Sequence, residues 1–405
     1  MATVRKRTWK TASGEEKTGW FVDYVDQHGV RGRKQFTTKR FADAFRVDIE
    51  SKIQNGIFRA DANKVLFGEV AIDFLEHCEG RRDRKERMTE KMFRVYEGHI
   101  KNYICPDPKR HENKRRPPRL ISFDPGHGLA ATKVGQLTQG GVCAFRDRLR
   151  NAGVSVITTR KIISTVQGIL KFAIAQDIIV INVAQDVRVI GRRDEGAKKI
   201  IPPSKAAMRA LLEVADKDFR VRLLVASATA VRAGEFHALR WKHFDLEQGE
   251  VIVETRVDAF GNEDTTKTAA GIRTIPIGQV VVMALKEWKL RTSFKKDNDL
   301  VFPNSSGTFE DHDNMVKREF EPLFPKAAKR HAEDPKKIPK VARFNWHALR
   351  HFGISTWIEA GMLPKTIQTF AGHSSLQVTM DRYGHLFKSD DHRKVMDDIA
   401  KRLFS

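Results

Sequence analysis

Residues 371–383 read AGHSSLQVTMDRY, and the interpretation of the whole chain begins from this stretch. His373 follows a glycine, and Tyr383 lies ten residues further on, after a short segment with the apolar spacing of a helix. Ser374 or Ser375 is expected to open that helix, because a serine side chain accepts hydrogen bonds from the free amides of a helix start. A histidine and a tyrosine in this arrangement are candidates for phosphate binding and nucleophilic attack.

Two upstream segments add positive charge to this pair. They are His347-Ala348-Leu349-Arg350 and Arg232-Ala233-Gly234-Glu235. A guanidinium group stays charged at any working pH and pairs with phosphate oxygens, so Arg232 and Arg350 suit the binding of a phosphodiester. His347 and Arg350 are three residues apart and would share one face of a helix. The combined set could hold a phosphodiester and attack it.

Lys267 lies in the segment Thr265–Thr268, between strand-like residues 251–257 and 272–277, where a hairpin would project it outward. A lysine can protonate an alkoxide leaving group when neighbouring arginines lower its pKa. Loop lysines are usually only solvated, and isolated tyrosines usually serve packing. The assignments of Lys267 and Tyr383 therefore depend on the rest of the set.

Composition favours a polyanionic partner. The 405 residues carry 73 Lys and Arg against 51 Asp and Glu, a formal charge of +22, and 40% of them are hydrophobic, enough for folded cores. Nucleic acid is the first candidate partner for such a charge, and a merely basic or ribosome-like protein is the alternative.

The sequence predicts no metal site, no ATP-binding site and no membrane-spanning segment. His347 and His351 have a spacing that can hold zinc, but no Glu follows His347 and the nearby arginines would repel a cation. No phosphate-binding glycine loop or paired-carboxylate nuclease motif occurs. Cys78, Cys105 and Cys143 are far apart, which fits a reducing cytoplasm, and no apolar run approaches the ~18 residues of a membrane span. We therefore expect no cofactor, no membrane association and a cytoplasmic location.

The chain is predicted to be multidomain and mainly α. Residues 1–60 read as a small antiparallel β-sheet, around 20–25 and 31–36, followed by a helix from Thr38. With 13 basic and 7 acidic residues, this module could press a strand face or its loops against DNA, or be a solvated cap.

Residues 64–187 are predicted to form a bundle of four helices. We expect Gly153 to stop the third helix and Thr158 or Thr159 to cap the fourth. A basic, proline-rich insertion near 105–130 interrupts the bundle; six of its residues from Asp107 to Arg119 are Lys or Arg.

Residues 188–203 are a linker by composition, and Ser204 is expected to cap the first helix of a mixed α+β, mostly helical region with a small β-sheet, 204–388. Within it, 326–343 is expected to be irregular, His347 is expected to begin a helix that ends at Gly361, and Pro364 opens another. The tail, 389–405, predicts a helix with a narrow apolar stripe that packs either on its own domain or on a neighbouring protomer.

Four segments, TAVRAGEFHALRW, TKTAAGIRTIPI, HALRH and AGHSSLQVTMDRYGHL, occur in this order between 229 and 386. In sequence and spacing they resemble the tyrosine recombinase, or phage integrase, family. The resemblance covers about 204–388 closely, and 1–185 only in architecture. It implies an arm-type DNA-binding domain at 1–60, a SAM-like core-binding domain at 64–187, and a catalytic domain at 204–388.

The resemblance also implies a role for each candidate residue. Tyr383 would attack the scissile phosphate and leave a 3′-phosphotyrosine and a free 5′-hydroxyl. Arg232 and Arg350 would stabilise the transition state, and Lys267 would protonate the 5′-oxygen. His347 would act as acid or base toward the tyrosine. His373 would bind the phosphate, and Glu235 would support Arg232. Ala230 stands where the family often has glycine, a change expected to touch no catalytic group.

The resemblance further implies that the chain integrates or excises a mobile element in a bacterial host, at the nucleoid. The implied partners are double-stranded attachment sites, three further copies of the chain in a tetramer with possible exchange of the C-terminal helix, and DNA-bending or excisionase-like proteins. Two alternatives use the same scaffold: a type IB topoisomerase-like enzyme that relaxes DNA, and a DNA-binding regulator without catalysis.

Overall fold

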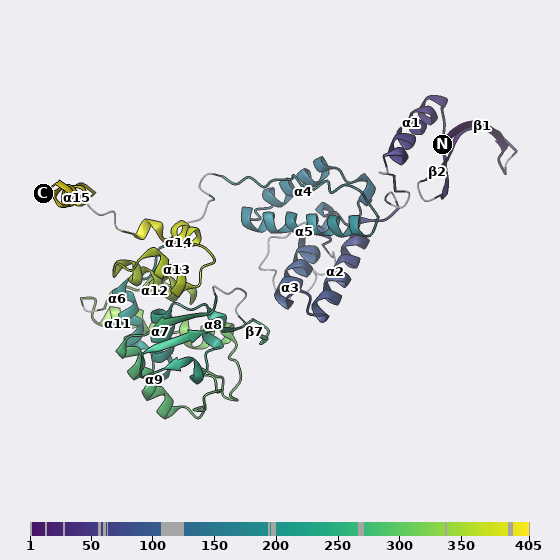
Figure 1. Ribbon diagram of the computed structural model, residues 1–405. Coiled ribbons are helices and arrows are strands. Elements are labelled where there is room, and N and C mark those ends of the chain that lie inside the picture. Colours follow the sequence, from purple (N-terminus) through teal and green to yellow (C-terminus); the bar gives the residue numbers. More distant parts are fainter. Residues whose placement is uncertain are drawn as a thin grey trace. The chain divides into compact units, whose positions relative to one another are not determined.

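The computed structural model describes residues 2–12, 14–26, 29–55, 58–59, 62, 64–106, 125–192, 195, 200–265, 271–336, 338–387 and 392–404. The chain divides into an N-terminal unit, Met1–Gly196, and a C-terminal unit, Ala197–Ser405. Figure 1 draws the first in purple to blue and the second in teal to yellow. Most of the predicted basic insertion lies outside the described residues, and so does Lys267.

The N-terminal unit begins with an antiparallel sheet of β1 (Thr3–Lys10), β2 (Glu16–Val25) and β3 (Arg31–Phe36), in that order. Helix α1 (Lys39–Gln54) follows, and the Thr38 hydroxyl caps it by accepting from the amide of Phe41. The helix packs on one face of the sheet through Val22, Ala42 and Ile49. The predicted helix and the strands around 20–25 and 31–36 are confirmed, and β1 is a third strand that was not predicted.

Four helices follow: α2 (Phe67–Asp83), α3 (Glu90–His99), α4 (Gln139–Asn151) and α5 (Val156–Ala175). Their apolar faces share one core, in which Phe67, Phe145 and Ile162 are fully buried. Helix α3 continues as a π-helical turn, Ile100–Ile104. Gly153, with φ 81°, lies just beyond α4 as expected.

The predicted cap of α5 was wrong. Ser155 caps the helix by accepting from the amide of Thr158 at 3.1 Å, whereas Thr159 is buried in the core and donates to the carbonyl of Val154. The helix therefore begins one turn earlier than predicted, because Val156 also belongs to its buried face.

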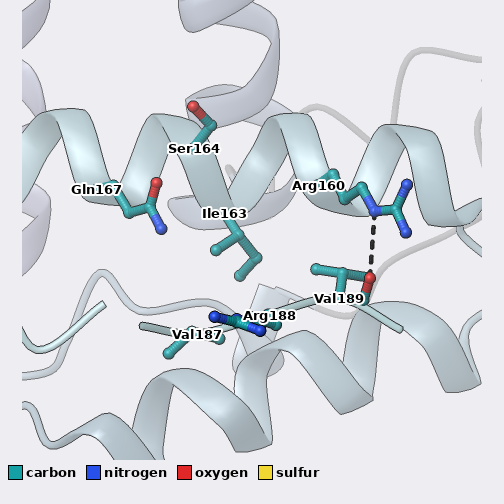
Figure 2. Close-up of a pocket in the computed structure, with 7 residues that line it drawn as sticks. All are labelled: Arg160, Ile163, Ser164, Gln167, Val187, Arg188 and Val189. Carbon is teal, nitrogen blue, oxygen red and sulfur yellow. Dashed lines mark hydrogen bonds between the residues drawn. The ribbon is translucent and has the colours of Figure 1, made fainter. Parts of the chain in front are cut away.

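A pocket of about 350 Å³ lies in the N-terminal unit, between α5 and residues 187–189. Figure 2 shows the guanidinium groups of Arg160 and Arg188 at this pocket, with Ser164 and Gln167 along the helix. Arg160 Nε donates to the carbonyl oxygen of Val189 at 3.1 Å, while the side chain of Arg188 is exposed.

The C-terminal unit opens with α6 (Lys205–Val214), capped by Ser204 as predicted, followed by α7 (Lys217–Thr229) and the short α8 (Ala233–His237). A three-stranded antiparallel sheet orders β4 (Phe244–Asp245), β5 (Glu250–Val253) and β8 (Arg273–Pro276). Strands β6 (Thr255–Val257) and β7 (Glu263–Thr265) form a separate hairpin, and β7 was not predicted.

The remaining helices are α9 (Gln279–Arg291), α10 (His312–Met315), which continues as a π-helical turn to Phe320, α11 (Leu323–Glu333), α12 (His347–Glu359), α13 (Pro364–Ala371), α14 (Leu376–Tyr383) and α15 (His392–Phe404). The prediction of irregular structure was wrong for 326–333, because Leu323, Phe324 and Ala327 form a buried helical face, and it is confirmed for 334–336 and 338–343. Ser375 caps α14, as one of the two predicted serines.

Helices α7 and α12 approach so closely that only glycine fits at the contact. A Cβ atom on Gly353 would lie 2.2 Å from the carbonyl oxygen of Ser227 and 2.9 Å from the Cβ of Ala230. Ala230 ends α7 with φ 50°, in the left-handed region that L-residues other than glycine rarely adopt. This contact sets the end of α7 against the helix that begins with His347.

Within the part of the chain described here, no helix is both long and apolar enough to cross a membrane.

Candidate active site

Arg350 is the most deeply buried of the predicted arginines and ties two helix ends together. Its Nη1 donates to the carbonyl of Ala230 and its Nη2 to the carbonyl of Ala371, both at 2.6 Å. The residue is 3% exposed. Burial, and then the charge of Arg232, lower the pKa of Arg350 to about 9, so it remains a cation at neutral pH. The contact with Ala230 is made by its backbone carbonyl, which a glycine at this position would also offer.

Arg232 occupies the N-cap of α8 and is far more open, with 43% of its side chain exposed. Its Nη1 donates to Glu235 Oε1 at 2.9 Å and its Nη2 to the carbonyl of Gly372 at 2.8 Å. The carboxylate of Glu235 also accepts from the backbone amide of Arg232 at 2.9 Å. Arg232 and Arg350 thus reach the same turn, at Ala371 and Gly372, from two different helices.

Arg273 joins this group and was not predicted from the sequence. It donates to Glu235 Oε2 at 2.8 Å, to the carbonyl of Phe370 at 2.7 Å and to the carbonyl of Gly271 at 2.9 Å. Burial raises the pKa of Glu235, but hydrogen bonds and the charges of Arg273 and Arg232 outweigh it and hold that pKa at about 2. An arginine inside a strand, alternating with Ile275 on a buried face, was the sequence signal that could have revealed it.

His373 follows the turn and is 2% exposed. Its Nδ1 lies 2.9 Å from the hydroxyl of Thr379, and no group among the described residues lies within hydrogen-bond distance of its buried Nε2. Burial first, and then Arg350 and Arg232, lower the pKa of His373 to about 3. A neutral imidazole with a free nitrogen is suited to donate a hydrogen bond to an anionic oxygen.

Tyr383 ends α14, with its side chain fully buried. Its ring is stacked on that of His373, at 6.1 Å between centroids and 16° between planes. Burial raises the pKa of Tyr383, while the charges of Arg350, Arg382 and Arg232 oppose that rise. The phenol is therefore neutral at pH 7 and needs a base before it can attack.

The phenolic oxygen of Tyr383 lies 2.6 Å from Nδ1 of His351. From the sequence, His351 was expected only as a possible metal ligand. His347, one helical turn earlier, is exposed, and its ring lies edge-on to that of His351 at 4.8 Å. Partial burial, and then the charges of Arg350, Arg382 and Arg232, lower the pKa of His347.

The structure thus brings together five of the six residues predicted to be catalytic, and Glu235 beside them. Arg232, Arg350 and His373 lie at one turn. The ring of Tyr383 stacks on that of His373, and His347 lies at the start of α12. Lys267 follows β7 and precedes Gly271, whose carbonyl Arg273 holds, but it falls outside the described residues. Among the described residues, no group of three or more histidine, cysteine or acidic side chains is arranged to hold a metal.

Comparison with known proteins agrees with this geometry. Residues 203–390 match the phage integrase family. The chain is 24% identical over 392 residues to a "Tyrosine recombinase XerC-like" protein of Caldanaerobacter subterraneus subsp. tengcongensis, covering 89% of this chain and 90% of that protein. It is 25% identical over 387 residues to the "ICEBs1 integrase" of Bacillus subtilis, covering 93% and 95%.

Solved structures share the fold. The Tn1549 transposon integrase in complex with a circular intermediate DNA matches 81% of this chain and 99% of its own, with a TM-score of 0.60 and 19% identity. A lambda integrase tetramer bound to a Holliday junction matches 95% and 97%, with a TM-score of 0.53 and 16% identity. Residues 203–390 thus match the phage integrase family, and the arrangement of Arg232, Arg350, His373 and Tyr383 lies within this match.

Proposed function

We propose that the chain is an integrase, a site-specific recombinase that cuts and rejoins DNA through a 3′-phosphotyrosine to integrate or excise a mobile element. One observation carries the proposal: Arg232 and Arg350 reach the same turn from two helices, beside His373 and above the buried Tyr383. A phosphate placed at this turn would receive two guanidinium groups and an imidazole, while the phenol lies beneath it.

Each residue has a step in the proposed reaction. Tyr383 attacks phosphorus, Arg232 and Arg350 stabilise the charge on the nonbridging oxygens, and His373 donates from its free Nε2 to one of them. Glu235 and Arg273 hold Arg232 in position. Lys267 protonates the departing 5′-oxygen. The family resemblance assigns the role of acid or base toward the tyrosine to His347, which is exposed at the start of α12 with its ring beside that of His351.

The phosphate must approach a tyrosine that is covered in the free chain. Because Tyr383 is fully buried, DNA binding has to expose the phenol, whereas Arg350 and Arg232 can keep their backbone carbonyls and give further N–H groups to the phosphate. The phosphotyrosine bond retains the energy of the broken phosphodiester, so religation to another strand requires neither ATP nor a metal.

Double-stranded DNA is the proposed partner of the N-terminal unit as well. One face of the β1–β2–β3 sheet packs on α1 through Val22, and strand alternation puts Arg5, Arg7, Arg31 and Arg33 on the other face. All four side chains are exposed. We propose that this face is the arm-type DNA-binding surface of residues 1–60.

The four-helix bundle, within residues 64–187, is the proposed core-binding domain. The pocket along α5 carries Arg160 and Arg188, whose guanidinium groups are suited to a backbone phosphate (Figure 2). This contact would position the duplex without reading its sequence.

A homotetramer on DNA is the proposed assembly, with α15 donated to a neighbouring copy. Four apolar side chains of α15, Met396, Ile399, Leu403 and Phe404, are 43 to 88% exposed. Such a stripe needs a groove to cover it, and a neighbouring protomer would supply one. DNA-bending and excisionase-like proteins would assist, and the site of action would be the bacterial cytoplasm, at the nucleoid.

Recombination is favoured over the two alternatives. The relatives reported above are named as a recombinase and an integrase. The set of catalytic side chains is complete in the sequence, which argues against a regulator without catalysis.

A plasmid that carries both ends of the DNA element encoding the chain tests the proposal. We expect recombination between the ends by the wild-type protein and none by Tyr383→Phe. Relaxation of a supercoiled plasmid that lacks those ends, without recombination of the first plasmid, would favour the topoisomerase-like alternative.

A further inference from the structure

His351 and Tyr383 are joined by the shortest side-chain contact made by the proposed nucleophile. His351 lies in the second turn of α12 and Tyr383 at the end of α14, with 2.6 Å between Nδ1 and the phenolic oxygen. The two ring centroids are 5.8 Å apart. The contact exists in the free chain, so the partner of the phenol is in place before DNA arrives.

The other two histidines of the site have different relationships to the tyrosine. His373 lies parallel to the phenol ring, and its Nδ1 is engaged by Thr379. Its Nε2 is the nitrogen left for a phosphate oxygen. His347 contacts the edge of His351. His351 is thus the histidine whose ring nitrogen meets the phenolic oxygen.

The charges around His351 keep its imidazole neutral. Partial burial, followed by His347 and Arg350 on its own helix and Arg382 on α14, lowers the pKa of His351 to about 4. Burial raises the pKa of Tyr383. At neutral pH a phenol therefore faces a neutral imidazole, and a neutral imidazole has one nitrogen able to accept a proton.

We propose that His351 is the general base that accepts the phenolic proton of Tyr383 as the tyrosine attacks the phosphate. The inference rests on the proposed recombinase function. The O–H bond of Tyr383 breaks and its proton moves to Nδ1 of His351, while the phenolic oxygen bonds to phosphorus. The bond from phosphorus to the 5′-oxygen breaks, and that oxygen takes its proton from the acid, Lys267. In religation the 5′-hydroxyl attacks phosphorus and gives its proton to Lys267, the bond from phosphorus to the phenolic oxygen breaks, and His351 returns its proton to the tyrosine.

The test measures single-turnover formation of the covalent adduct on nicked suicide DNA for wild type and for His351→Gln, with non-covalent binding of the same DNA measured in parallel. Glutamine keeps a hydrogen bond to the phenol but cannot take its proton. We expect His351→Gln to bind DNA as wild type does and to form the adduct about 10² to 10⁴ times more slowly. His331→Gln, on α11, is the matched control and should keep the wild-type rate.

A second measurement uses only the wild-type protein, so it does not depend on the folding of a variant. Replacing the bridging 5′-oxygen by sulfur gives a leaving group that needs no proton, so the rate then reports the base alone. With His351 neutral above about pH 4, the rate should be constant from pH 6 to 8. A rise of about tenfold per pH unit over that range would mean that hydroxide or the bulk phenolate equilibrium supplies the base and would overturn the proposal.

The two proposals fail in different ways. Adduct formation by His351→Gln within about threefold of the wild-type rate would reject the role of His351 and leave the recombinase function standing. If wild type forms no adduct with either leaving group, the recombinase function fails, and the role of His351 fails with it.

Discussion

Arg273 donates to both carboxylate oxygens of Glu235, at 2.8 and 3.3 Å, and the side chains of the two residues are 1% and 4% exposed. The pair connects strand β8 to the N-terminus of α8, where Arg232 begins. Through the carbonyl of Phe370, it also reaches the turn before His373. A buried ion pair thus holds three parts of the site that are far apart in sequence.

Removing one partner of this ion pair should lower the free energy of unfolding more than replacing both partners. Arg273→Met leaves the Glu235 carboxylate buried with Arg232 as its remaining ion-pair partner, and we expect a loss of about 3 to 5 kcal/mol in the free energy of unfolding. Adding Glu235→Gln removes the charge of this buried carboxylate and should recover part of that loss. Urea unfolding of the two single variants and the double variant checks this, and strictly additive effects would show that the two side chains are not coupled.

Gly353 is expected to tolerate no side chain. In Gly353→Ala, the new Cβ would overlap the backbone of Ser227, separating α7 from α12 at a cost of about 1 to 3 kcal/mol. Because Arg350 bridges from α12 to the end of α7, adduct formation should fall as well. Gly278→Ala is the control, since nothing lies within 4 Å of a Cβ at that position and its φ is −72°. Equal stability of the two variants would contradict the close packing.

The C-terminal unit should lose stability as the pH falls from about 6.5 to 4.5. The pKa values of His237 and His373 are both lowered to about 3, chiefly by burial, against about 6.5 in the unfolded chain. The unfolded state therefore binds protons in this window that the folded state does not, and stability present above pH 6.5 is lost below it. Each histidine contributes up to about 1.4 kcal/mol per pH unit.

Urea unfolding followed by tryptophan fluorescence measures this dependence, because four of the six tryptophans lie beyond residue 240. His237→Gln removes one titrating group and should reduce the slope by about one proton. Glu235, with a pKa of about 2, contributes only below the window. Equal stability at pH 6.5 and 4.5 would mean that these histidines are not buried in the neutral form.

Arg188 should contribute to DNA affinity without contributing to stability. Its side chain is exposed at the pocket along α5 (Figure 2). Loss of one phosphate contact in Arg188→Ala should weaken binding to all sequences alike and reduce the slope of log affinity against log salt by about 1. Fluorescence anisotropy with labelled duplex DNA at several salt concentrations measures both. An unchanged slope would place the phosphate elsewhere.

Local patterns in the sequence predicted most of the elements. The serine at 204 and the threonine at 38 mark helix starts correctly, because capping depends on a hydroxyl and an amide three residues apart. Residues 326–333 were misjudged because their apolar residues are only alanines, while the large buried residues of this helix, Leu323 and Phe324, precede them. Strand β7 was missed because Glu263–Thr265 pairs only with β6 and carries no apolar pattern.

The candidate site was predictable to the extent that its residues belong to motifs. Arg232, Arg350 and Tyr383 could be named from the sequence, but their contacts could not, because those are made to backbone carbonyls such as Ala230 and Ala371. Arg273 and His351 were missed for the same reason. Their importance comes from partners 38 and 32 residues away, which only the fold brings close.

The central claim is that Tyr383 attacks DNA, and a nicked suicide substrate tests it most directly, because loss of the short strand traps the covalent complex. The wild-type protein should yield a protein–DNA adduct that survives SDS, and Tyr383→Phe should bind the same DNA and yield none. An adduct formed by Tyr383→Phe, or none formed by wild type on DNA that contains its own recombination site, would contradict the account.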